Sequence, residues 1–246
     1  MRLKLISCEV LFREMCAMAA RSPHTVDVEF LPKGLHDIGA EAMRQRLQSS
    51  VDAVDPERYD AVVLGYALCG NGIAGLMARQ LPVVVFRAHD CIALLMGGRA
   101  EYDAYFQANS GVYFRSTGWL ERGKNLDQSM LRVSKRKSGL GFTLEELIAK
   151  YGDENGRYVW QQLTQYLNSY RKLAYIATGV EVDGSFRDRA RHEAEEKGWE
   201  FEEFTGGLGL FQRLLSGDWN AREFLVLPPG RRIEPSYKED IVRIGG

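Results

Sequence analysis

Three cysteines of this chain follow apolar runs that predict β-strands. They are Cys8 after the run 3–7, Cys69 after the run 59–66, and Cys91 after the run 82–86. Open α/β sheets bind ligands beyond the carboxyl ends of their strands, and we expect the three thiols to converge at that edge. Thiolates suit zinc and other transition metals of similar softness, and three protein ligands with an open fourth position are typical of catalytic zinc. The pattern therefore predicts a metal site with Cys8, Cys69 and Cys91 as ligands.

Two other interpretations of these cysteines stay open. Cysteine is a common small apolar residue in protein cores, and the chain has no Cys-x-x-Cys pair that would mark a metal site locally. An iron–sulfur cluster, which commonly takes four thiolates, is the alternative to a single metal ion. Cys16 lies about 12 Å from Cys8 along a predicted helix, so we interpret it as a buried core residue.

Polar residues beside the cysteines are candidates for the remaining chemistry. His89 lies two residues before Cys91 and is predicted to be a fourth metal ligand or a general base, with a hydrogen-bonded strand-end histidine as the alternative. Glu9 and Arg13 follow Cys8 and are candidates for orienting a charged substrate.

The glycines after Cys69 indicate a tight turn with exposed backbone. Gly70, Asn71 and Gly72 are predicted to present N–H groups that suit a phosphate or a carboxylate. The spacing fits neither the P-loop nor the dinucleotide fingerprint, so no nucleotide cofactor is predicted.

The elements that position these residues alternate between strand and helix. Strands are predicted at 3–7, 25–31, 59–65 and 82–86, and helices at 9–20, 37–50, 71–80, 91–96 and 100–108. This order predicts an α/β fold with a doubly wound, mostly parallel, Rossmann-like sheet.

The rest of the chain predicts a second α/β series. We divide the sequence into an N-terminal lobe at 1–110 that carries the cysteines, a mixed linker and helical segment at 111–170, and a C-terminal α/β lobe at 171–246. Two similar lobes and one extended sheet both stay open. The predicted elements are strands 112–114, 172–177, 199–204 and 223–227, a turn at 117–119, and helices 143–150, 154–170, 184–197 and 208–216.

Composition and charge argue against binding to nucleic acid or to a membrane surface. The chain has 246 residues, a hydrophobic fraction of 45% and a formal net charge of -1, which gives no general reason to expect nucleic acid or a membrane surface as a partner. The basic run 132–137 is interpreted as a solvated loop. No secretory signal and no membrane-spanning segment is predicted. We therefore expect a cytoplasmic protein with reduced thiols.

Three segments that contain the cysteines resemble the domain of unknown function 1638 (DUF1638) family. They are Ser7-Cys8-Glu9-Val10-Leu11-Phe12-Arg13-Glu14, Gly65-Tyr66-Ala67-Leu68-Cys69-Gly70-Asn71-Gly72 and Arg87-Ala88-His89-Asp90-Cys91-Ile92. Further parts of the pattern are Gly97, Tyr102, Tyr105-Phe106, Thr117-Gly118-Trp119 and the segment 224–230. The resemblance implies a prokaryotic cytoplasmic protein, with some relatives associated with anaerobic one-carbon and corrinoid-dependent methyl-transfer pathways.

A second similarity concerns a single motif. His89-Asp90-Cys91 is similar to the His-x-Cys element of zinc-dependent corrinoid methyltransferases, whose zinc activates a thiol substrate. Those enzymes are (β/α)₈ barrels with a further cysteine ligand downstream, whereas Cys8 and Cys69 lie upstream here.

Together these patterns predict a metal-binding enzyme that activates a thiol or water for small-group transfer, with methyl transfer as the leading example. The expected cofactor is zinc or another transition metal. The expected partners are a small-molecule substrate and a corrinoid protein, and self-association stays open. The alternatives are a non-catalytic metallochaperone or accessory protein of corrinoid-dependent pathways, and an iron–sulfur redox protein.

Overall fold

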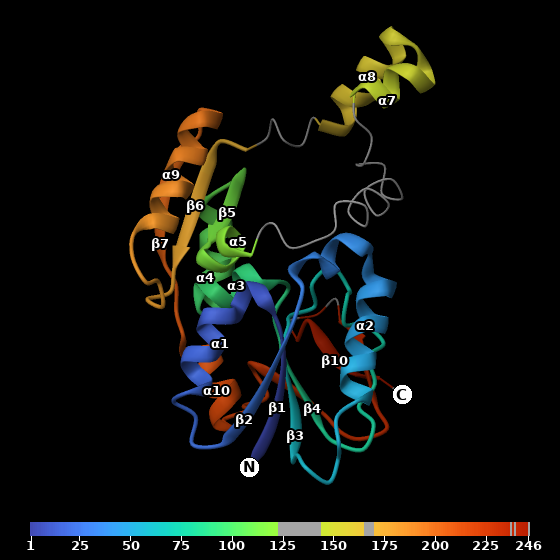
Figure 1. Ribbon diagram of the computed structural model, residues 1–246, viewed down its shortest axis with the longest axis vertical. Helices are drawn as coiled ribbons and strands as arrows, with labels where there is room; N and C mark the ends of the chain where they lie inside the picture. Colours follow the sequence, from blue (N-terminus) through green and yellow to red (C-terminus); the bar gives the residue numbers. More distant parts are fainter. Residues whose placement is uncertain (123–143, 165–169, 237, 239, 246) are drawn as a thin grey trace.

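The computed structural model describes residues 1–122, 144–164, 170–236, 238 and 240–245. Its larger sheet has five strands in the order β2-β1-β3-β4-β8. They are β2 (Thr25–Leu31), β1 (Arg2–Cys8), β3 (Ala61–Gly65), β4 (Val83–Phe86) and β8 (Phe224–Leu227). The first four are parallel, and β8 runs antiparallel to β4. Figure 1 shows the four parallel strands running upward to the edge where the cysteines were expected.

Burial explains this strand order. Every residue of β3 and β4 is buried, as continuous apolar runs require of central strands covered on both faces. Strand β2 alternates apolar with polar residues, is mostly part-exposed and lies at the edge.

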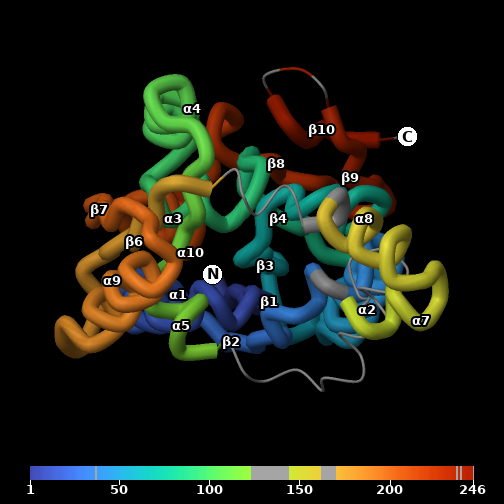
Figure 2. Tube along the Cα trace, turned by 90° about the horizontal axis from the view of Figure 1, so that it is seen from above, coloured from blue at the N-terminus to red at the C-terminus, as the bar shows by residue number. Residues whose placement is uncertain are grey.

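Helices cover both faces of this sheet (Figures 1 and 2), so the α/β fold is doubly wound, mostly parallel and Rossmann-like. On one face lie α1 (Phe12–Ala19), which follows the short 3₁₀ helix η1 (Glu9–Leu11), together with α3 (Cys91–Met96) and α10 (Gly209–Ser216). On the other face lies α2 (Ala40–Asp52), which follows η2 (Lys33–Ile38).

A second sheet has three parallel strands in the order β5-β6-β7. They are β5 (Val112–Ser116), β6 (Lys172–Ala177) and β7 (Glu200–Thr205). On one face, α9 (Ser185–Lys197) packs Ala190 and Ala194 against Leu173 and Tyr175. On the other face, Tyr105 of α4 (Arg99–Ala108) contacts Phe114 and Phe204.

The carboxyl edge of the second sheet is anchored to helices of the first. After β7, the N–H of Gly207 donates to the carbonyl of Leu95 in α3 at 3.0 Å. After β6, the Thr178 hydroxyl donates to the Glu14 carboxyl of α1 at 2.8 Å. One hydrophobic core includes residues of both sheets, among them Leu64 of β3 and Ile176 of β6.

The strands cross the expected lobe boundaries. Strand β8 comes from the range 171–246 and joins the sheet that carries the cysteines, whereas β5 comes from the range 111–170 and joins the second sheet. The last strands, β9 (Arg232–Pro235) and β10 (Val242–Gly245), form an antiparallel hairpin. Helices α7 (Leu144–Tyr151) and α8 (Asp153–Thr164) pack against each other at one end of the molecule, as Figure 1 shows.

Two local predictions are wrong. Residues 71–80 form turns rather than a helix, because Asn71 and Gly75 have positive φ and the backbone of this segment pairs with residues 230–233 instead. Residues 117–119 belong to the short helix α5 (Thr117–Glu121), where the Ser116 side chain accepts a hydrogen bond from the Trp119 N–H. Three predicted parts lie outside the described residues: Thr143 at the start of the predicted helix 143–150, the basic run 132–137, and residues 165–169 of the predicted helix 154–170.

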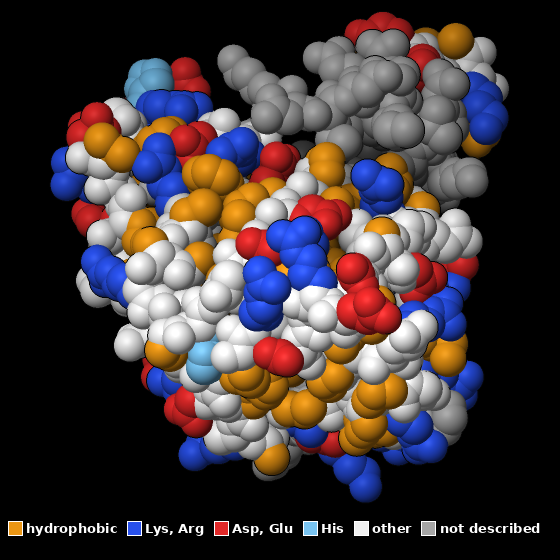
Figure 3. Space-filling model, turned by 60° about the horizontal axis from the view of Figure 1, so that its bottom comes forward, with side chains coloured by type: hydrophobic (Ala, Val, Ile, Leu, Met, Phe, Trp, Pro, Cys, Tyr) orange, Lys and Arg blue, Asp and Glu red, His pale blue; other side chains and the backbone are white. Residues whose placement is uncertain are grey.

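The described surface fits the balanced composition. Basic and acidic side chains are interspersed on the face in Figure 3, with hydrophobic side chains between them. None of the helices in the described parts of the chain is long and apolar enough to cross a membrane.

Candidate functional site

The three cysteines lie at the carboxyl edge of three adjacent strands. Cys8 is the last residue of β1, Cys69 follows β3, and Cys91 is the first residue of α3 after β4. The chain passes from β1 outward to β2, then crosses back to β3 and continues to β4 on the other side. This reversal is the topological switch point where open α/β sheets bind their ligands, and Cys8 and Cys69 flank it.

All three thiols are buried and near one another. Cys8, Cys69 and Cys91 are only 3%, 9% and 7% exposed. Burial raises the pKa of Cys8 to about 12 and raises the pKa of Cys69 and Cys91 as well. For Cys91, the neighbouring Cys69 and Cys8 add to this rise in pKa. The thiols are therefore protonated at neutral pH unless a cation displaces their protons.

The thiols do not form a finished metal site. Among the described residues, no three His, Cys, Asp or Glu side chains are grouped so that they hold a metal ion as they stand. Each sulfur lies on one rotatable χ1 torsion, so its position at this edge depends on the side-chain rotamer.

Cys69 occupies an unusual backbone conformation. Cys69, Gly70 and Asn71 have φ values of 49°, 61° and 69°, a region that residues with a Cβ rarely adopt. The N–H of Cys69 donates to the carbonyl of His89 at 2.8 Å, and the N–H of Gly72 donates to the carbonyl of Cys69 at 3.1 Å. The loop after β3 is thus held against the loop after β4.

Helix α5 covers this edge of the sheet. A Cβ on Gly118 would lie 1.7 Å from the Val10 carbonyl oxygen, so only glycine allows α5 to approach η1 so closely. The neighbouring Trp119 has the Lys33 ammonium 4.5 Å from its ring centroid. The backbone N–H of the same residue, Lys33, donates to the Glu9 carboxylate at 2.9 Å.

Two hydrogen-bond donors near the thiols lack an acceptor. The Tyr66 hydroxyl and the Trp119 indole N–H are buried, and neither makes a hydrogen bond of full geometry to the residues that the structure describes. Sequence reasoning missed both as site residues. The available signal was their position, since Tyr66 ends the apolar run before Cys69 and Trp119 belongs to a motif that supported the family resemblance.

The other predicted site residues lie around the thiols rather than among them. His89 is exposed, and Glu9 accepts the Lys33 N–H. Arg13 makes a bidentate ion pair with Glu121 at 2.9 and 2.8 Å. Cys16 is half-buried on α1, so its prediction as a buried core residue is wrong.

The glycine-rich turn offers fewer backbone N–H groups for binding an anion than expected. Gly70 and Asn71 are exposed, but Gly72 is buried against Met43 and its N–H already has an acceptor. The structure therefore places the turn at the site without giving it a clear role in binding an anion.

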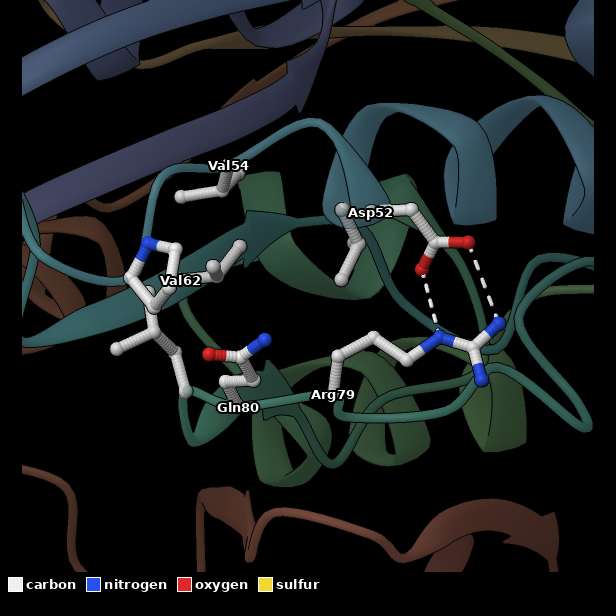
Figure 4. A pocket seen from close by; sticks show the side chains of 8 residues that line it. Asp52, Val54, Val62, Arg79 and Gln80 are labelled. Atoms are coloured by element: carbon white, nitrogen blue, oxygen red, sulfur yellow. Dashed lines mark hydrogen bonds and ion pairs between the residues drawn. The ribbon is translucent and has the colours of Figure 1, made fainter.

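Two cavities lie away from the thiols. One of about 100 Å³ lies where β3 and β4 begin, and Figure 4 shows the Asp52–Arg79 ion pair on its wall, with contacts of 2.8 and 3.2 Å. Another of about 680 Å³ lies beside α3 and is lined by Phe86, Leu94 and Arg213 among others. No cysteine lines either cavity.

Comparison with known proteins identifies a family but no characterised relative. A family model described as "Protein of unknown function (DUF1638)" matches residues 30–215. The matched range contains Tyr66, Cys69, Cys91 and Trp119 and begins after Cys8. No curated protein and no solved structure matches the chain.

Proposed function

Because the chain belongs to the DUF1638 family, whose description assigns no activity, its function has to be inferred from the site, and we propose that Cys8, Cys69 and Cys91 bind a metal centre. The observation that supports this proposal is the placement of three buried thiols on three adjacent strand ends beside the switch point.

The proposed activity is transfer of a small group, such as a methyl group, in a cytoplasmic enzyme. A bound zinc or other transition metal would lower the pKa of a coordinated thiol or water, and three thiolates would leave negative charge that favours its alkylation. The chain's own contribution is to keep water out with α5 and Trp119. His89 is exposed next to the buried thiols, so we assign it to proton transfer with solvent rather than to metal binding. Glu9 and Arg13 hold the surrounding loops through Lys33 and Glu121.

An iron–sulfur centre is the second candidate, and the spread of the cysteines favours it. Neighbouring strands lie about 4.8 Å apart, so β1, which ends at Cys8, and β4, which ends before Cys91, are about two such spacings apart. Thiolates on one zinc ion, with bonds of about 2.3 Å, lie about 4 Å from each other. A cluster would span this edge with smaller movements.

Metal analysis after anaerobic expression and purification tests the proposal. We expect the wild-type protein to hold metal in stoichiometric amount. Stoichiometric zinc supports the first candidate, and iron with acid-labile sulfide supports the second. Absence of metal, together with indifference to chelators, would overturn both.

Single substitutions locate the ligands. We expect Cys8→Ser, Cys69→Ser and Cys91→Ser each to lose most of the metal, because each removes one of three thiolates. Cys16→Ser is the matched control, since Cys16 is half-buried on α1 and lies outside the group of three. Equal metal content in all four variants would contradict the assignment.

Turnover separates an enzyme from a metal carrier. We expect the metal-loaded protein to move a methyl group from a methylated corrinoid protein to a small thiol, and Cys69→Ser to abolish this transfer. Release of metal to an acceptor protein without turnover would instead support the metallochaperone alternative.

A further inference from the structure

Two buried donors without acceptors indicate a missing partner at the thiol site. Buried polar groups in folded proteins are almost always hydrogen-bonded, because an unsatisfied one loses its bonds to water and gains none in return. The Tyr66 hydroxyl and the Trp119 indole N–H are both buried, and within the described part of the chain neither has an acceptor in full hydrogen-bond geometry. Because both lie at the edge that carries the three thiols, one partner located there would satisfy both.

The strand register places Tyr66 beside Cys8. In the parallel pairing of β1 with β3, Ser7 lies opposite Gly65 as the last pair, and Cys8 and Tyr66 are the residues that follow on the two segments. Tyr66 is only 1% exposed, so its hydroxyl has no access to bulk water.

The packing of α5 against η1 places Trp119 at the same site. Gly118 contacts the Val10 backbone, two residues after Cys8, and Lys33 lies over the indole ring. The indole N–H acts toward the Cys91 sulfur as a hydrogen-bond donor, although the two atoms do not reach the geometry of a full hydrogen bond. A thiolate turned toward the centre of the site would be a stronger acceptor than the neutral thiol.

We infer that Tyr66 and Trp119 donate hydrogen bonds to the sulfur atoms of a metal–thiolate centre with net negative charge. This inference rests on the proposed function. Three thiolates around a divalent cation carry one net negative charge, which is costly to bury unless donors face it. A tyrosine O–H and a tryptophan N–H supply such donors without adding a second cation.

Metal affinity and spectroscopy test this role in the full chain. We expect Tyr66→Phe and Trp119→Phe each to bind Zn²⁺ and Co²⁺ about 10–100-fold more weakly, as is typical when the hydrogen-bond partners of metal ligands are removed. We also expect the sulfur-to-cobalt charge-transfer band to shift, because the electron density on the sulfurs changes. Competition with a chromophoric chelator measures the affinity.

The metal-free stability separates this role from a structural one. Tyr66→Phe removes a hydroxyl that has no protein partner, so the metal-free variant should be as stable as the wild type or more stable. Two control variants remove donors that do have partners. Tyr175→Phe loses the contact with Thr117, and Trp219→Phe loses the bond to the Leu214 carbonyl. Both controls should lose stability but keep the affinity for metal.

The failures of the two proposals are distinguishable. If the wild type binds metal and both variants bind it as tightly with an unchanged cobalt spectrum, the donor role is overturned and the metal site stands. If the wild type binds no metal, both proposals are overturned.

Discussion

Cys69 carries a thiol at a backbone position that residues with a Cβ avoid. Its φ of 49° is followed by positive φ at Gly70 and Asn71, and its N–H is bound to the carbonyl of His89. The left-handed conformation costs a non-glycine residue about 1–2 kcal/mol. Strain of this kind persists where surrounding structure imposes it, often at functional sites. A cysteine rather than a glycine at this position is consistent with a need for the sulfur.

Replacing Cys69 tests this strain directly. We expect Cys69→Gly to be more stable than Cys69→Ala by about 1 kcal/mol, because glycine adopts positive φ at little cost and both variants lack the sulfur. Urea unfolding of the two metal-free variants measures the difference. Equal stability, or a more stable alanine variant, would show that the turn relaxes and stores no strain.

At the scale of elements, apolar runs predicted the strands well, whereas the short segments that connect the strands were predicted poorly. The runs at 61–65 and 83–86 are buried on both faces, so their residue types follow directly from their position. Residues 71–80 have helical composition, but their backbone pairs with residues 230–233, a partner that no local pattern indicates. Helix α5 depends on a cap from Ser116 and on contact with η1, and both were missed.

The close contact between α5 and η1 leads to a prediction about stability. Gly118→Ala should lower the free energy of unfolding by about 3 kcal/mol, because the new Cβ would collide with the backbone of Val10 rather than with a movable side chain. The control is Gly209→Ala in α10, whose new Cβ meets only the flexible end of Arg213. Guanidinium unfolding should give the control a midpoint close to that of the wild type. A wild-type midpoint for Gly118→Ala would show that α5 does not need this contact.

At the scale of the whole molecule, the sequence predicted that the three cysteines lie at one edge of the sheet but not the surroundings that enclose them. Parallel strands end at one edge, so Cys8, Cys69 and Cys91 were placed together by topology alone. Tyr66 and Trp119 meet that site only because β3 pairs with β1 and because the second sheet brings α5 onto η1. Likewise β8 joins the first sheet from the far end of the chain. Such long-range contacts leave no periodicity in the sequence.

Glu14 joins the two sheets through a buried carboxyl group. It is 1% exposed, one oxygen accepts the Thr178 hydroxyl, and the other oxygen is buried without a partner. Burial raises the pKa of Glu14, the nearby Glu181 raises it further, and Arg13 lowers it. The folded protein therefore keeps a proton on Glu14 at pH values where the unfolded chain has lost it.

This proton makes the junction sensitive to pH, and Glu14→Gln removes the sensitivity. Above the unfolded pKa of about 4.3, unfolding releases the proton, so the free energy of unfolding contributed by this site falls as pH rises until the folded pKa is passed. Glutamine keeps an acceptor for Thr178 and cannot ionise. We therefore expect the variant and the wild type to be similarly stable at pH 4 and the variant to be more stable at pH 8, measured by urea unfolding at both values. An advantage that is constant or shrinks with pH would mean that Glu14 is ionised in the folded protein and that the junction between the sheets holds a charge.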